Sequence, residues 1–206
     1  MHDLDLEPAP GGDVRAGLVA SSASIVWTAV TSALAIALGI NARSVALVAF
    51  GAVGLFDMAG SAALVVHFRH ALRHDVISHR HEHIAHLVVS YGMLTVGIAT
   101  LIASVYRLTA DSHASASLTG LVTSAASILA LGYLGTSKRR IGRRIPSQAL
   151  ATDGALSLIG CGTATFTVAG LGLNNAFGWS WVDPAAAMII AVTAIALATV
   201  SLRRAD

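Results

Sequence analysis

The sequence predicts an all-α integral membrane protein of six transmembrane helices, with its N- and C-termini in the cytoplasm. Hydrophobic residues make up 55% of the 206 residues and charged residues only 12%, and the mean hydropathy is +0.72. An ordinary soluble domain is about one-quarter charged because its surface faces water. Here the charges gather in short patches between long apolar runs, which is typical of a chain that crosses a membrane several times.

Six apolar stretches are each long enough to cross a bilayer core, which takes about 20 helical residues. They are preceded by residues 1–15, whose Asp, Glu, Pro and Gly content predicts a flexible acidic cytoplasmic tail. Small residues are abundant inside the stretches, as in helices that pack closely in lipid. We therefore expect one six-helix transmembrane domain over residues 16–206. Its helices are expected at residues 16–40, 45–68, 84–106, 114–136, 148–173 and 184–202.

The uneven distribution of Lys and Arg predicts how the helices are oriented. Eleven of the thirteen such residues lie on the side of the two termini, and only Arg43 and Arg107 lie on the other side. Cytoplasmic loops of membrane proteins carry the excess of Lys and Arg. Both termini, a His-rich connection at 67–86 and a basic loop at 137–147 are therefore expected in the cytoplasm, in a multi-pass protein of the cell (plasma) membrane.

The start of the last stretch carries two tryptophans followed by an Asp-Pro pair. Trp179 and Trp181 suit the interfacial belt of a membrane protein. Asp183 and Pro184 suit the N-cap and the first turn of a helix. We therefore expect Asp183 to cap the sixth helix rather than to bind an ion.

Two acidic residues, Asp57 and Asp153, lie within the apolar parts of the stretches, and no Lys or Arg is expected to join them there. A charged side chain at bilayer depth costs between roughly 2.5 and more than 10 kcal/mol. The functional interpretation is a polar interior path that binds cations or protons. The alternative is that both carboxyl groups are protonated and hydrogen-bonded to Ser61, Ser157 or Thr152.

The depths of the two residues suggest successive stations along one path. At 1.5 Å per helical residue, Asp57 lies roughly 16 Å and Asp153 roughly 8 Å from the cytoplasmic face. The two carboxylates therefore need not share an ion.

Seven of the nine histidines fall between positions 67 and 86, interleaved with Asp75 and Glu82. Helical spacing places several of them on common faces, and imidazole and carboxylate groups are normal zinc ligands. The candidate ligands here are His74, Asp75, His79, His83 and His86, with His67 and His70 on the same face as His74. The alternative is that these histidines simply suit a lipid headgroup interface.

Other chemistry is missing from the sequence. There is no phosphate-binding glycine loop, no HExxH motif and no convincing Ser/His/Asp arrangement, so we expect neither an enzyme nor a tightly bound cofactor. The lone cysteine, Cys161, excludes an intramolecular disulfide and a cysteine-based zinc site. The basic residues lie at helix ends, where topology accounts for them, so no nucleic-acid partner is expected.

Three segments resemble the membrane domain of the cation diffusion facilitator family, the cation-efflux transporters, and in particular its short bacterial members. They are VAFGAVGLFD at 48–57, SQALATD at 147–153 and GWSWVDPA at 178–185. The resemblance implies a carrier that exports divalent cations, commonly zinc, in exchange for protons, often as a homodimer. It places the family's ligand positions on Val53, Asp57, Leu156 and Gly160, of which only Asp57 is acidic. Asp153 matches an acidic position seen in some members.

Three functional hypotheses follow from these observations. The first is a proton-coupled divalent-cation transporter, with zinc as the expected metal, that works by alternating access through Asp57 and Asp153. The second is a non-transporting structural or accessory subunit of a larger membrane complex, which keeps the fold without the ligands. The third is a metal-sensing or storage module that uses only the histidine connection, through His79, His81 and His83.

Overall fold

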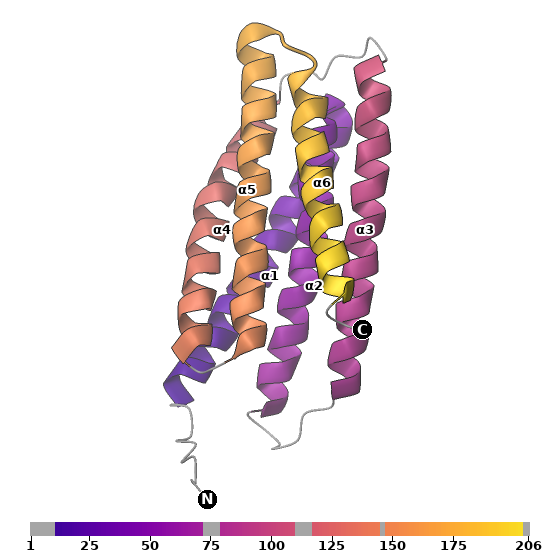
Figure 1. Cartoon of the computed structure of the whole chain (residues 1–206). Helices are drawn as coiled ribbons and strands as arrows, with labels where there is room; N and C mark the ends of the chain where they lie inside the picture. The colour runs from indigo at the N-terminus through magenta and orange to yellow at the C-terminus, as the bar shows by residue number, and fades with distance from the viewer. Residues whose placement is uncertain (1–10, 72–78, 110–116, 145–146, 204–206) are drawn as a thin grey trace, which may run out of the picture.

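The computed structural model describes residues 11–71, 79–109, 117–144 and 147–203, and this part of the chain forms six helices (Figure 1). All six are long and apolar enough to cross a membrane, which confirms the predicted fold class. They are α1 (Gly11–Ala42), α2 (Val45–Ala71), α3 (His79–Thr109), α4 (Leu118–Arg144), α5 (Gln148–Phe177) and α6 (Val182–Arg203).

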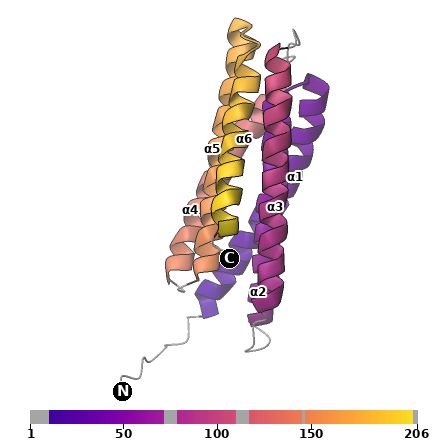
Figure 2. The same cartoon turned by 45° about the vertical axis from the view of Figure 1, so that its right-hand side comes forward.

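The helices form a group of four with a pair beside it. α1 packs on α2 and α4, and α5 packs on α4 and α2. α3 packs chiefly on α6 and also contacts α2, and it runs beside α6 in both views (Figures 1 and 2). α1, α3 and α5 begin at the lower end of Figure 1, and α2 and α4 end there. These five expected cytoplasmic helix ends therefore lie together, while the side of the membrane that they face stays a prediction.

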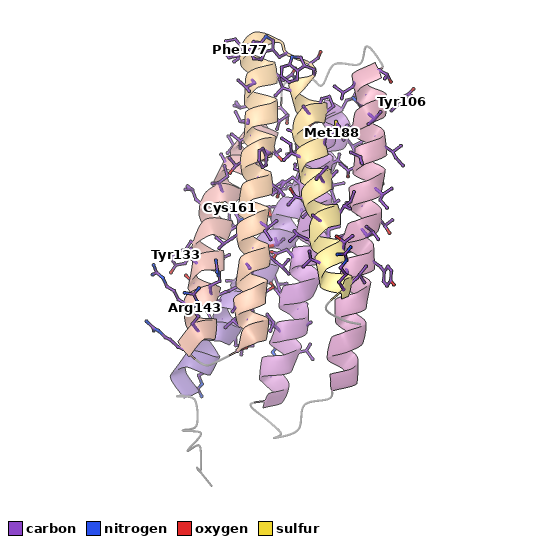
Figure 3. All side chains as sticks on the ribbon, viewed as in Figure 1. Tyr106, Tyr133, Arg143, Cys161, Phe177 and Met188 are labelled. Atoms are coloured by element: carbon purple, nitrogen blue, oxygen red, sulfur yellow. The ribbon has the colours of Figure 1, made fainter. Side chains whose placement is uncertain are left out.

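The outward faces of the helices are apolar. Large side chains such as Val26, Ile102 and Leu129 are more than half exposed. The labelled Tyr106 and Tyr133 likewise lie on the outer side of their helices (Figure 3). Hydroxyl-bearing residues, in contrast, fill much of the interior of the bundle. This arrangement is the inverse of a soluble protein's. It suits a lipid environment, because polar side chains that face the hydrocarbon would lack hydrogen-bond partners.

Most helix boundaries differ from the prediction by one to eight residues, and two of these differences affect the expected tail and the expected basic loop. α1 begins at Gly11, so the last five residues of the expected tail, 11–15, are helical; acidic residues are favourable near a helix N-terminus and do not prevent this. α4 continues to Arg144, so most of the expected basic loop 137–147 is helix. Lys and Arg are good helix formers, and the loss of hydropathy beyond Thr136 does not stop a helix that still packs on its neighbour.

Glycines allow the backbones of α4 and α5 to touch. A Cβ atom on Gly142 would lie 2.7 Å from the amide nitrogen of Ala151, and one on Gly135 would lie 2.8 Å from the carbonyl oxygen of Gly154. Real Cβ atoms do not come so close to backbone atoms, so only glycine fits at these positions. The close approach brings the stretch of α4 between the two glycines directly against the start of α5.

Candidate cation site in the membrane interior

A buried ion pair lies where α4 meets α5. The Nζ atom of Lys138 is 2.7 Å from Oδ2 of Asp153, and the two side chains are 0% and 3% exposed. We expected no cation beside the interior carboxylates and assigned Lys138 to the basic loop, which is wrong. Because α4 runs on past Thr136, Lys138 lies on its buried face between Gly135 and Gly142.

Three serine hydroxyls complete the surroundings of the ammonium group. Nζ donates to the Oγ atoms of Ser24 at 2.8 Å, Ser61 at 3.0 Å and Ser157 at 3.1 Å. Ser61 in turn donates to the carboxylate of Asp153, with its Oγ 3.1 Å from each oxygen. An ammonium has three N–H donors and no acceptor, so four oxygen neighbours satisfy it fully. These contacts offset the cost of holding a charge away from water.

Asp57 joins the same network from α2. Its side chain is 7% exposed and accepts hydrogen bonds from Ser157 at 3.2 Å and from Thr28 at 3.4 Å. Ser157 therefore connects Asp57 to Lys138, which is itself paired with Asp153. The two carboxylates, predicted as separate stations, belong to one network built by α1, α2, α4 and α5. With all three groups ionised, the network carries one net negative charge.

The hydroxyl partners expected for the two carboxyl groups are found in part. Ser61 contacts Asp153 and Ser157 contacts Asp57. The side chain of Thr152, the third expected partner, lies outside the described part of the structure. The hydrogen bonds therefore exist, but they surround an ion pair rather than two isolated carboxyl groups.

A small cavity of about 20 Å³ lies next to Asp57, large enough for about one water molecule. Its polar lining comes from Asp57 and hydroxyl side chains of α1 and α5. The three other positions that the family resemblance would make ligands also line it: Val53, Leu156 and Gly160. These positions therefore do converge on Asp57, but their side chains are apolar or absent.

The histidine cluster lies largely outside the described residues. His74 and Asp75 fall in the segment 72–78, and the side chains of His67, His70, His79, His83 and His86 are outside the description, although their backbones are helical in α2 and α3. Among the described residues, no three His, Cys, Asp or Glu side chains come together. A metal ion at the interior site would thus find two carboxylates and several hydroxyls as described ligands.

Asp183 caps a helix, but a different one from the helix we predicted. It lies in the first turn of α6, and its carboxylate accepts hydrogen bonds from the hydroxyl of Ser44 and from the amide of Val45 at 2.9 Å. Ser44 directly precedes α2, and Val45 is its first residue. The N-terminal amides of any helix lack internal partners, and the start of α6 packs close enough to supply one. Asp183 thus joins α6 to α2.

A sequence signal for Lys138 does exist. It is the only lysine among the thirteen Lys and Arg residues of the chain. It also falls on a helical stripe of mostly small residues spaced three and four apart, which the structure shows to be the buried face of α4. The stripe consists of Gly120, Ser124, Ser127, Leu131, Gly135, Lys138 and Gly142.

Two comparisons with known proteins bear on this site. A family model described as the cation efflux transmembrane domain matches residues 21–205. This range covers nearly the whole chain and includes Asp57, Lys138 and Asp153. The comparison with curated proteins finds no match.

Proposed function

The chain belongs to the cation-efflux family of transmembrane domains. We propose that it carries a divalent metal cation out of the cytoplasm in exchange for protons, and that this cation is zinc. The family consists of membrane transporters of cations rather than enzymes. The metal, the coupling to protons and the direction are parts of the proposal.

One observation supports the proposal most directly: two carboxylates and their hydroxyl partners lie in the interior of a membrane bundle. Asp57 of α2 and Asp153 of α5 are linked through Ser157 and Lys138. Hydroxyl groups of α1 also bond to this network. Apolar or neutral side chains would pack these helices at less cost. Buried ionisable residues in a transporter fold mark the path of an ion or a proton.

The proposed mechanism assigns a role to each group. Asp57 and Asp153 bind the cation when ionised and release it when protonated, while Ser157 and Ser61 supply neutral oxygen ligands. Carboxylate oxygens bind zinc, and a set made only of oxygens also suits manganese, so both metals should be tested. The helix groups rock around the site to open it to each side in turn. We further propose that the histidine connection gathers metal at the cytoplasmic mouth and that the protein works as a homodimer.

The direct test is metal flux into proteoliposomes under an imposed pH gradient. We expect proton-linked zinc or manganese flux in the wild type and at least a tenfold loss in Asp57→Asn and in Asp153→Asn, because each change removes a charged ligand. Asp183→Asn is the matched control, since Asp183 is also a buried carboxylate but caps α2. Undiminished flux in Asp57→Asn would remove that residue from the mechanism.

One observation favours a second function, that of a non-transporting subunit of a larger membrane complex. The cavity wall beside Asp57 is apolar at Val53 and Leu156 and bare at Gly160, and Asp153 is already neutralised by Lys138. On this hypothesis the correctly inserted protein moves no metal and purifies with stoichiometric partner proteins. Flux by the purified chain alone would exclude it.

A further inference from the structure

We propose that Lys138 is an internal cation, which occupies the carboxylate site in the absence of metal and which an incoming divalent cation must displace. This inference rests on the proposed function, because it describes how the same site exchanges its cations. It requires neither the histidine connection nor a particular metal.

The choice of residue at position 138 is the first argument. All other basic residues of the chain are arginines, including Arg139 and Arg140, which follow directly and are exposed. The labelled Arg143 also lies on the outer side of α4 (Figure 3). Arginine presents a wide planar fork, whereas lysine presents a compact point charge on a flexible stem. Among the Lys and Arg side chains that the structure describes, the one that is buried is therefore the one that most resembles a small cation.

The second argument is the geometry around the ammonium group. Its four neighbours are oxygens, at 2.7–3.1 Å, from Asp153, Ser24, Ser61 and Ser157. Divalent metals of the hard and intermediate classes also take carboxylate and neutral oxygens as ligands. The oxygens that contact the Lys138 ammonium in this structure are thus the same ones that would coordinate a metal ion.

The third argument is charge. Asp57 and Asp153 together supply two negative charges, which a divalent cation neutralises. With the Lys138 ammonium also present, the site would hold three positive charges against two negative ones, at short range and away from water. Like charges at such distances repel strongly in the interior of a protein. The metal and the ammonium are therefore alternatives at this site.

The displaced Lys138 side chain can reach the nearby end of α4. Lys138 lies six residues before Arg144, the last residue of α4, or about 9 Å along the helix axis. Lysine side chains near the ends of transmembrane helices extend to the headgroup region. A swing of the stem toward that end would leave Asp153 and the serines to the metal.

The first experiment measures binding of zinc and of manganese to the purified protein by titration calorimetry. We expect Lys138→Gln to bind metal at least tenfold more tightly than the wild type, and the gain to disappear in Lys138→Gln/Asp153→Asn. That requirement separates the interior site from any metal held by the histidine connection. Arg139→Gln, an exposed neighbour on the same helix, should bind as the wild type does. Equal or weaker binding by Lys138→Gln overturns the inference.

A second experiment keeps the inference testable if Lys138→Gln does not fold. Because Lys138 is the only lysine, an amine-acetylating reagent that permeates membranes can modify only this side chain and the chain's α-amino group. We expect slow acetylation of Lys138 in the metal-free wild type and at least fivefold faster acetylation at saturating metal. Protection that persists in the metal-saturated protein overturns the inference.

The two proposals fail in different ways. Metal flux by the wild type without a gain of metal affinity in Lys138→Gln would support the transporter function and refute the role of Lys138 as an internal cation. A gain of affinity in Lys138→Gln without wild-type flux would do the reverse, because the metal and the ammonium would then compete for a site in a protein that does not transport.

Discussion

At the scale of single residues, the molecule is organised around one buried lysine. Lys138 contacts Asp153 and the hydroxyls of three helices, and Ser157 passes the network on to Asp57. A buried ion pair often adds little net stability, because desolvation opposes the attraction. Removing only one of the two charged side chains is costly, however, because the remaining buried charge then has no partner.

This asymmetry leads to a prediction about stability. Lys138→Met should destabilise the protein by about 3–5 kcal/mol, since it leaves the Asp153 carboxylate buried without its cation. The double variant Lys138→Met/Asp153→Asn should recover much of that loss. Denaturant unfolding in detergent, followed by tryptophan fluorescence, measures both. Additive effects of the two single substitutions would contradict the coupling.

At the scale of the helices, close backbone contact positions the ion pair. α4 and α5 touch at Gly142 and at Gly135, on either side of Lys138. At the other end of the bundle, Asp183 ties the start of α6 to the start of α2, and the guanidinium of Arg107 donates to the carbonyl oxygen of Arg43 at 2.8 Å. These contacts link helices that hydropathy alone cannot pair.

The glycine contact can be tested against a matched glycine in the same helix pair. Gly142→Ala should destabilise the protein by about 1–3 kcal/mol, because the new methyl group meets the backbone of Ala151. A Cβ atom on Gly162 of α5 would meet nothing within 4 Å. Gly162→Ala should therefore be neutral or stabilising by about 0.5–1 kcal/mol, as expected for alanine in a helix. Thermal unfolding of the two variants in detergent decides the matter, and equal effects would refute the contact.

At the scale of the whole molecule, α1, α2, α4 and α5 supply the described polar network, and α3 with α6 packs beside them (Figure 2). The starts and ends of the helices alternate between the two ends of the bundle. Most of the arginines in the described part of the chain lie at the end where α2 and α4 terminate. The distribution of basic residues predicts that this end faces the cytoplasm.

The orientation can be checked with single cysteines in a Cys161→Ser background. A membrane-impermeant maleimide should label Trp179→Cys in intact cells, because that residue lies at the opposite end of the bundle and is half exposed. It should label Arg143→Cys only after the membrane is permeabilised, with at least a tenfold difference in labelling. The reverse pattern would place both termini outside.

The sequence by itself determined the six helices and the two interior carboxylates. A bilayer demands about 20 apolar residues per crossing, so hydropathy locates each span, and an aspartate inside such a span is conspicuous without any structure. The helix boundaries were predicted less well where a helix extends into a polar segment. Residues 11–15 of the expected tail and the basic segment 137–144 are helical, because hydropathy reports lipid contact and not backbone conformation.

Only the tertiary structure decided which way the polar side chains face. In the sequence, Lys138 belongs to a basic run that predicts a loop. In the structure, α4 continues through this run and its glycine-lined face packs on α5. Asp183 looks like the cap of its own helix until α6 is placed beside the start of α2. Both outcomes depend on contacts between segments far apart in the chain, which local composition does not encode. The ion pair at the centre of the candidate site is therefore a product of helix packing.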